Sequence, residues 1–366
     1  MKYYIISGEA SGDLHGSNLI KNILLLDNKA EIRCWGGDKM SAAGGVLVKH
    51  YKDLAFMGFV EVIRNLKTIM QNLSFCKKDI ADFKPDVLVL IDYPGFNMRI
   101  AQWAHKSAIK IVYYISPQVW AWKEDRVKML KKTVNEMLVI LPFETSFYKK
   151  WNWEVKYVGH PLVEVVDDFK KNHQEIIRDS MLIAILPGSR KQEILKKLPV
   201  MLEVTKSLPN YRFVVAKAPG LPENFYNELL KDYPAVSWVE GKTYHLLMEA
   251  QAAMVTSGTA TLETALFGVP QVICYKGNPI SYHIAKRLVK IKYIGLVNLI
   301  MDKPIVEELI QDHLTVERIL TALSPLLTET DKRKQILSYY DELTHLLTKG
   351  GNASANAAKS IVDIAG

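Results

Sequence analysis

Apolar runs that suit buried β-strands alternate with helical segments along most of the chain, and this alternation restricts the fold more than any other feature. Many runs are rich in β-branched residues and lack polar alternation, which is typical of strands covered on both faces. The strand–helix order predicts parallel sheets joined by right-handed crossovers. The separating helical stretches include Leu14–Leu26, Lys191–Leu208 and Ala260–Leu266. The predicted strands are Tyr3–Ser7, Ile32–Trp35, Val87–Ile91, Ile109–Ile115, Met137–Leu141, Leu182–Leu186, Arg212–Ala216, Val236–Val239, Ala253–Thr256 and Gln271–Tyr275.

The strands form two sets, and a chain of 366 residues is long enough for two domains of about 100–200 residues each. Between the sets lies Glu164–Ser180, a polar and charged segment that we interpret as a linker, with the boundary near Val166. We predict an α/β protein with two Rossmann-like, doubly wound domains, over residues 1–166 and 167–314. A helical tail over 315–366 is expected to pack back on the N-terminal domain or on a partner subunit. Such sheets bind ligands beyond the carboxyl ends of their strands, so we expect a site in a cleft between the domains.

The net charge and composition of the chain limit the classes of partner that it is expected to bind. Lys and Arg number 47 against 39 Asp and Glu, a formal net charge of +8, which favours an anionic partner. The basic residues are scattered without interleaved aromatic residues, so no nucleic-acid partner is predicted. The three cysteines lie far apart and indicate no disulfide framework. No apolar run approaches the roughly 20 residues that span a bilayer, and the start does not fit a signal peptide, which predicts a cytoplasmic protein, soluble or peripheral to a membrane.

The first predicted strand ends in a glycine-rich segment. Glycines at 8, 12 and 16 allow a tight turn before a helix that starts near Asp13, and Ser11, Gly12 and Asp13 are candidates for binding an anion or a sugar. The spacing fits neither a dinucleotide fingerprint nor an ATP-binding P-loop. A structural turn in which Asp13 caps a helix explains the same residues equally well.

Asp92 directly follows the buried strand Val87–Ile91 and is the candidate general base. A carboxylate in this position accepts a proton from an attacking hydroxyl if it faces the cleft. Asn97, five residues on, is a candidate for positioning the acceptor. A turn aspartate and a capping asparagine are the simpler explanation for this segment taken alone.

Two turns in the second half suit a diphosphate. Gly188, Ser189 and Arg190 lie between a strand and a helix, where free N–H groups and an arginine bind phosphate oxygens. Ser257, Gly258 and Thr259 repeat this arrangement after a later strand, and Glu263 lies one helical turn further on, where a carboxylate can accept hydrogen bonds from ribose hydroxyls. The structural alternatives to these binding roles are an arginine that is merely exposed at the surface and a glutamate that stabilises the start of its helix by interacting with the helix dipole.

For each of two apolar segments, the sequence is consistent with two interpretations. The tryptophans of Ser116–Trp122 either stack on a sugar or belong to the core. Leu54–Ile63, which contains Phe56, Met57, Phe59 and Val60, is either a core helix or an exposed strip that holds acyl chains or enters a membrane surface, and sequence alone favours the core. The nine histidines show no metal-ligand spacing, so we predict no metal and no cofactor, with His15 only a reserve base.

The motifs together resemble those of the lipid-A-disaccharide synthase family, inverting glycosyltransferases of the GT-B fold. The resemblance covers nearly the whole chain, and the ordered set of motifs is far more specific than any single one. The matching segments are Gly8–Asp13, Met57–Val62, Ile91–Asn97, Ser116–Trp122, Leu141–Glu144, Gly159–His160, Leu186–Arg190, Ser257–Glu263 and Asn298–Leu299.

The resemblance implies a reaction in which UDP-2,3-diacylglucosamine donates its sugar to 2,3-diacylglucosamine 1-phosphate (lipid X). The products are the β-1,6-linked lipid A disaccharide 1-phosphate and UDP. It implies Asp92 as the base, and Arg190, Glu263, Asn298 and the Ser257–Thr259 turn on the nucleotide side. It also implies an N-terminal acceptor domain, a C-terminal UDP-sugar domain and action at the inner face of the cytoplasmic membrane. Some members exchange C-terminal segments in a homodimer.

One departure from the family pattern affects the mechanism. Many relatives carry a second acidic residue where Gly95 stands, so here Asp92 is expected to act alone.

The sequence leaves two alternatives to this function. One is another GT-B enzyme that uses UDP-N-acetylglucosamine, such as a peptidoglycan transferase or a 2-epimerase, and the other is a non-catalytic nucleotide-sugar or membrane-binding module.

Overall fold

The computed structural model describes residues 1–54, 66–218, 220–278, 282 and 291–366, which form two compact α/β units. Unit 1 comprises Met1–Pro161 and Leu347–Gly366, and unit 2 comprises Leu162–Leu346. All the predicted strands are confirmed, and the C-terminal segment is helical as expected. The residues of that segment divide between the two units at Leu347, within one helix.

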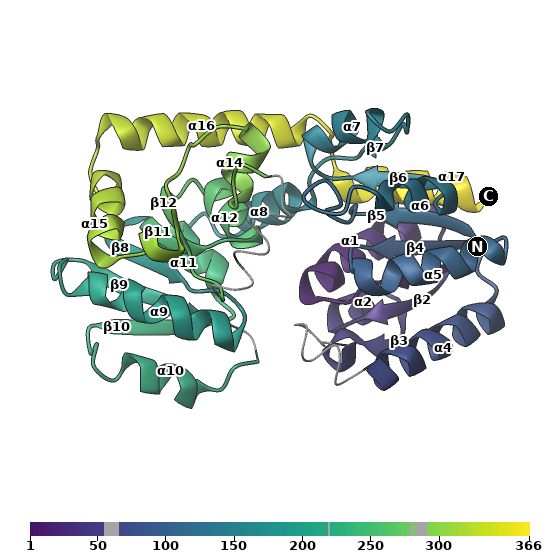
Figure 1. Ribbon diagram of the computed structural model, residues 1–366, viewed down its shortest axis with the longest axis horizontal. Coiled ribbons are helices and arrows are strands. Elements are labelled where there is room, and N and C mark those ends of the chain that lie inside the picture. The colour runs from purple at the N-terminus through teal and green to yellow at the C-terminus, as the bar shows by residue number, and fades with distance from the viewer. Residues whose placement is uncertain (55–65, 219, 279–281, 283–290) are drawn as a thin grey trace. The chain divides into compact units, whose positions relative to one another are not determined.

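Unit 1 is built on a parallel seven-stranded sheet with the strand order β3-β2-β1-β4-β5-β6-β7 (Figure 1). Its strands are β1 (Lys2–Ile6), β2 (Glu31–Gly36), β3 (Val46–His50), β4 (Val87–Ile91), β5 (Lys110–Tyr114), β6 (Glu136–Val139) and β7 (Lys156–Tyr157). Its helices are α1 (Ala10–Leu26), α2 (Asp38–Ala42), η1 (Tyr51–Leu54, a 3-10 turn), α4 (Leu66–Phe83), α5 (Pro94–Lys106), α6 (Arg126–Thr133), α7 (Pro142–Lys149) and α17 (Ala353–Ala365).

Successive residues of the central strands of unit 1 enter different cores. Tyr4 and Ile6 of β1 pack with α4, α5 and α6 on one face, whereas Tyr3 and Ile5 pack with α1, α2 and α17 on the other. All four side chains are fully buried. Burial on both faces explains why the sequence of these strands shows no polar alternation.

The last helix, α17, completes unit 1. Its Ala357 and Ile361 are fully buried in the core that contains β1 and β4, and the helix packs against α1. In Figure 1 the yellow α17 accordingly lies beside elements coloured purple and blue, which come from the start of the chain. The two ends of the sequence therefore belong to one folding unit.

Unit 2 is built on a parallel six-stranded sheet with the strand order β10-β9-β8-β11-β12-β13. Its strands are β8 (Asp179–Leu186), β9 (Arg212–Lys217), β10 (Val236–Glu240), β11 (Ala250–Thr256), β12 (Gln271–Tyr275) and β13 (Glu308–Ile310). Its helices are α8 (Pro161–Asn172), α9 (Lys191–Thr205), α10 (Glu223–Leu230), α11 (Thr243–Glu249), α12 (Thr259–Leu266), α14 (Leu296–Met301), η2 (Gln311–His313), α15 (Val316–Leu323), η3 (Ser324–Leu326) and α16 (Asp331–Thr348).

Three strands were not predicted, and each lies at or next to a sheet edge. β3 is at least partly exposed along its whole length, while β7 has two residues and β13 has three. Strands this short or this exposed lack the apolar run that makes a central strand recognisable. The polar segment expected as a linker is helical as far as Asn172, where α8 ends, and joins β8 at Asp179. The apolar residues Leu162, Val163 and Val166 of α8 are buried.

Candidate active site

Asp92 lies at the carboxyl end of β4, in an abrupt turn between that strand and α5. Asp92 and Tyr93 have φ angles of 44° and 48°, in the left-handed region that non-glycine residues rarely adopt. Pro94 then occupies the first turn of α5, where its missing N–H costs no hydrogen bond. Two consecutive strained residues cost on the order of 1–3 kcal/mol each, so the surrounding contacts must hold the turn in place.

Hydrogen bonds to its backbone fix Asp92. Its carbonyl oxygen accepts from the Tyr113 hydroxyl at 2.7 Å and from Asn97 Nδ2 at 2.9 Å, and its N–H faces the carbonyl oxygens of Tyr114 and Ile115, both at 3.3 Å. Asn97 Nδ2 also lies 3.4 Å from the Ile6 carbonyl and 3.2 Å from that of Ile91. Asn97 is fully buried, so the structure places it beneath the turn as a brace for Asp92.

The Asp92 carboxyl has the pKa expected of a general base. Burial, and to a smaller extent the nearby negative charge of Glu9, raise its pKa to about 7, although the hydrogen bond from the backbone N–H of Tyr93 acts in the opposite direction. A carboxyl whose pKa lies near neutral pH can accept a proton and yet be ionised when needed. Glu9 was not identified from the sequence, because its proximity depends on β1 and β4 being neighbours in the sheet.

The glycine-rich turn after β1 lies against the Asp92 turn. A Cβ atom on Gly8 would come within 2.4 Å of the Tyr93 ring, so only glycine permits this approach. Ser11 is exposed on the first turn of α1, and Gly12 is buried. Asp13 is buried, and its carboxylate accepts hydrogen bonds from the N–H groups of Gly37, Lys39 and Met40 at 2.8, 3.2 and 3.0 Å. Asp13 thus holds the start of α2.

Two buried histidines lie near this turn. Burial lowers the pKa of His15 to about 4, and burial together with His15 lowers that of His160 to about 3. Both imidazoles are therefore neutral near pH 7. His15 Nδ1 is buried and has no hydrogen-bond partner among the described residues.

The tryptophans of the Ser116–Trp122 segment have different environments. Trp120 is buried and its indole N–H donates to Glu144 Oε1 at 3.1 Å, while Glu144 Oε2 accepts from Leu141 N at 2.9 Å. Trp122 is 42% exposed, and the cations of Lys123 and Arg126 lie 4.6 and 5.3 Å from its ring centroid. Trp120 is therefore a core residue, whereas Trp122 is accessible to a ligand. The predicted lipid-contact residues Phe56, Met57, Phe59 and Val60 lie outside the described part of the chain.

In unit 2 the two predicted phosphate-binding turns lie side by side. β8 and β11 are adjacent parallel strands, so their carboxyl ends meet at one edge of the sheet. Gly188 follows β8 with a φ of 108°, and its Cβ position would lie 3.2 Å from Thr256 Cγ2 at the end of β11. Ser189, Arg190, Gly258 and Thr259 are exposed here. The N-termini of α9 and α12 thus begin next to each other, which suits the binding of an anion.

Arg190 and Glu263 are placed on the two helices that start at these turns. Arg190 is the N-cap residue of α9, and its guanidinium pairs with Glu193 at 3.1 Å while remaining 58% exposed. Glu263 lies one turn into α12, and its Oε1 accepts a hydrogen bond from the Tyr244 hydroxyl at 2.7 Å. Burial raises the pKa of the Glu263 carboxyl, and the Tyr244 hydrogen bond lowers it. Tyr244 was not identified from the sequence because α11 precedes β11 and carries no motif.

Asn298 is buried and bonded to other protein groups. Its side chain is buried and donates to the Val306 carbonyl and to Glu308 Oε1, at 2.8 and 2.9 Å, while Oδ1 accepts from the N–H groups of Ile305 and Val306. Glu308 accepts from the N–H groups of Ile294 and Gly295. The Ile294 carbonyl in turn accepts from the Ser257 hydroxyl at 2.8 Å. Asn298 therefore acts on the Ser257 turn through Glu308.

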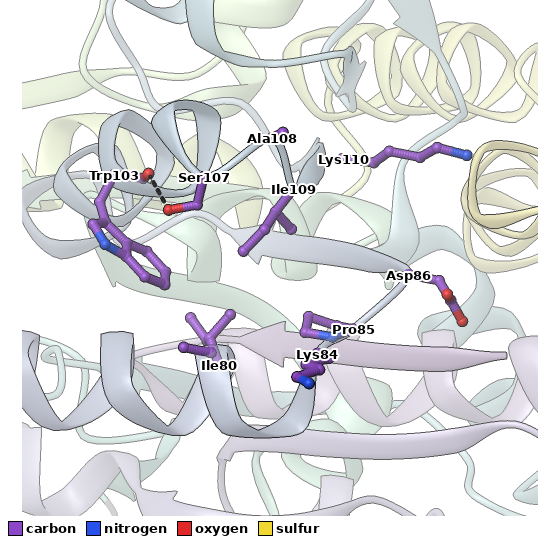
Figure 2. A pocket seen from close by; sticks show the side chains of 10 residues that line it. Ile80, Lys84, Pro85, Asp86, Trp103, Ser107, Ala108, Ile109 and Lys110 are labelled. Carbon is purple, nitrogen blue, oxygen red and sulfur yellow. Dashed lines mark hydrogen bonds between the residues drawn. The ribbon is translucent and has the colours of Figure 1, made fainter.

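A cavity of about 420 Å³ lies at the other end of the unit 1 sheet (Figure 2). Asp86 precedes β4 and Lys110 begins β5, so this cavity lies at the amino ends of the strands. Figure 2 shows the apolar side chains of Ile80 and Ile109 directed into it. It contains none of the predicted site residues.

Among the described residues, no group of three or more His, Cys, Asp or Glu is placed to hold a metal ion, and no helix is long and apolar enough to cross a membrane.

Two α/β units, each built on a parallel sheet, are the architecture of the GT-B class of glycosyltransferase folds. Solved structures with this fold are similar over nearly the whole chain. The glycotransferase of kitacinnamycin has a TM-score of 0.66 at 14% identity and covers 100% of this chain and 99% of its own. The UDP-GlcNAc 2-epimerase from Neisseria meningitidis has a TM-score of 0.61 at 13% identity, with the same coverage.

Sequence comparison then identifies the family. A sequence model described as lipid-A-disaccharide synthetase matches residues 3–362. The lipid-A-disaccharide synthase of Syntrophus aciditrophicus is 39% identical over 359 residues, which cover 95% of this chain and 93% of the relative. That of Coxiella burnetii (strain CbuG_Q212) is 36% identical over 367 residues, covering 98% and 96%. The chain belongs to the lipid-A-disaccharide synthetase family, and is a glycosyltransferase rather than a non-catalytic module.

The raised pKa of Asp92 predicts a pH-dependent stability. In the folded state the neutral carboxyl is favoured, so its contribution to stability is complete below the ordinary pKa of 3.8 and is lost as the pH rises to about 7. Asp92→Asn does not titrate. Its free energy of unfolding relative to the wild type should therefore increase between about pH 4 and pH 7 and level off above, measured by urea unfolding. Asp363→Asn, an exposed substitution on α17, corrects for the lost charge, and a difference that does not vary with pH would contradict the buried-carboxyl account.

Proposed function

We propose that this glycosyltransferase joins a diacylated glucosamine from a UDP donor to 2,3-diacylglucosamine 1-phosphate, giving a β-1,6-linked disaccharide 1-phosphate and UDP. The observation that supports it most strongly is family membership over residues 3–362 together with the strained, braced Asp92 turn. In this proposal unit 1 binds the acceptor and unit 2 binds the UDP-sugar. Ser11 and Gly12 contact the acceptor, while Asp13 and Asn97 support the turns from within.

Asp92 is the general base of the proposed reaction. Its carboxylate takes the proton of the acceptor's 6-hydroxyl while that oxygen attacks the anomeric carbon of the donor. The bond from this carbon to the UDP oxygen breaks in the same step, so the configuration inverts. The residue at position 95 is glycine, so it supplies no second carboxylate, and in this proposal Asp92 accepts the proton alone.

The departing UDP gains negative charge, which unit 2 is suited to stabilise. The N–H groups that follow Gly188 and Gly258 lie at adjacent helix starts, and Arg190 adds a fixed cation able to bind two phosphate oxygens. Glu263, oriented by Tyr244, accepts hydrogen bonds from the ribose hydroxyls. Asn298 holds the Ser257 turn through Glu308.

Asp92→Asn should lower kcat by roughly 100- to 10,000-fold, the usual contribution of a general base, with UDP affinity nearly unchanged. In the wild type, kcat/KM should fall about tenfold per pH unit below the Asp92 pKa of about 7, because only the ionised carboxyl accepts the proton. Glu9→Gln removes a nearby negative charge and should move this acid limb to lower pH. Near-normal turnover of Asp92→Asn, followed as UDP release, would assign the base to another residue.

Arg190→Ala should weaken UDP binding by roughly 10- to 100-fold, because charge-assisted hydrogen bonds to phosphate are lost. Isothermal titration of the full chain with UDP measures this. Arg212→Ala is the matched control, since Arg212 is 54% exposed and paired with Asp179 but begins β9 at the opposite end of the sheet. Equal UDP affinities of the two variants would place the diphosphate elsewhere.

The product's acyl chains make a membrane surface the natural place of action, and we propose peripheral attachment at the inner face of the cytoplasmic membrane. The support is the apolar sequence Phe56, Met57, Phe59 and Val60, followed by the basic residues Arg64 and Lys67.

We also propose a homodimer that exchanges α17. In such a dimer, α17 of one chain would make with α1 of the other the contacts that the two helices make here within one chain.

Met57→Glu combined with Phe59→Glu should reduce co-sedimentation with vesicles of phosphatidylethanolamine and phosphatidylglycerol, because two charges oppose insertion of an apolar strip. Leu25→Glu with Leu26→Glu, which alters an exposed apolar pair on α1, is the control for added charge. Undiminished vesicle binding of the first variant, or an equal loss in both, would exclude the 56–60 segment as the attachment point.

A further inference from the structure

Lys197 is a buried cation beneath the phosphate-binding turns that no motif predicted. It lies on α9, and its side chain is only 2% exposed. Its ammonium group donates to Thr256 Oγ1 at the end of β11 and lies 3.2 Å from Glu193 Oε2. A Cβ atom on Gly188 would lie 3.6 Å from the same nitrogen. Lys197 is thus adjacent to both turns at once.

The stability of the fold does not explain a charge at this position. Removing an ammonium from water costs several kcal/mol, and a single pair returns this only with excellent geometry on both sides. The partner Glu193 is 38% exposed and is shared with Arg190, so it compensates Lys197 weakly. In proteins generally, replacing a buried ion pair by apolar side chains of similar volume is often neutral or stabilising. The charge therefore has a use other than packing.

The surroundings of Lys197 indicate that use. Two cations, Lys197 and Arg190, both pair with one carboxylate, that of Glu193. The N-termini of α9 and α12 add partial positive charge at the same edge of the sheet. The hydrogen bond to Thr256 joins α9 to the residue immediately before the Ser257 turn. This hydrogen bond thereby fixes the distance between the backbone N–H groups of the Gly188 turn and those of the Ser257 turn.

We propose that Lys197 is a positioning residue for the diphosphate of the donor: it fastens the Gly188 turn to the Ser257 turn and places a fixed positive charge beneath both. This inference rests on the proposed function, because it takes a nucleoside diphosphate as the ligand of the two turns. It predicts that Lys197 contributes to the recognition of phosphate groups and not to that of the uridine. Lys197 does not touch the ligand.

The test compares UDP with uridine on the full chain. Lys197→Met keeps the volume and removes the charge, and its UDP affinity should fall roughly tenfold while its uridine affinity stays within about twofold of the wild type. UMP should show an intermediate loss. Lys170→Met is the control for loss of a lysine charge in unit 2, because Lys170 is a partly buried lysine of α8 whose ammonium donates to the Leu266 carbonyl at the C-terminal end of α12, away from the two turns. Its ratio of UDP to uridine affinity should equal that of the wild type.

An unchanged UDP-to-uridine ratio in Lys197→Met would overturn the inference, and so would the same change in both variants. Absence of UDP binding to the wild type would instead overturn the nucleotide assignment itself. If Lys197→Met does not fold, Lys197→Arg supplies a second measurement. Burial lowers the pKa of Lys197, so the wild type should lose UDP affinity on the alkaline side, and the arginine variant should lose it at higher pH. Superimposable pH profiles of UDP affinity would overturn the inference in that case.

Discussion

The pairing of central parallel strands determines where chemistry can occur in this protein. In a parallel sheet all carboxyl ends lie at one edge, and only neighbouring strands bring their following turns into contact. β1 pairs with β4 in unit 1, and β8 pairs with β11 in unit 2. The first pairing places the Gly8 turn and Glu9 against Asp92, and the second places Gly188 against Thr256. A shift of either register would separate residues that have no other reason to be close.

Each unit buries an ionisable group near these turns, Asp92 in unit 1 and Lys197 in unit 2. Burying these groups lowers the stability of the fold. Burial holds the Asp92 carboxyl near the midpoint of its titration at neutral pH, and it disfavours the ammonium form of Lys197. Neither group is neutralised by a fully buried opposite charge. The backbone strain at Asp92 and Tyr93 adds to this cost, and the hydrogen bonds from Tyr113 and Asn97 offset part of it.

The sequence was most informative about the central strands and the turns that follow them, because both depend on local patterns. Runs of apolar residues identify doubly covered strands, and a glycine or an aspartate directly after such a run identifies the turn. It was least informative about polar residues whose partners come from distant parts of the chain. Asp13 and Asn298 are engaged by backbone groups, and Glu9, Tyr244, Lys197 and Glu308 acquire a role only through the packing of elements. Edge strands such as β13 were missed because partial exposure removes their apolar signature.

The position of α17 has a consequence for synthesis of the chain on the ribosome. The β1–β4 face that it covers is made early, whereas its Ile361 is translated only after all of unit 2. Unit 2 has its whole sequence in one continuous segment and can reach its final structure while the nascent chain is still growing. Until α17 has been synthesised, unit 1 keeps exposed the part of this sheet face that α17 covers, and during that interval it is a natural client for chaperones that bind exposed hydrophobic surface.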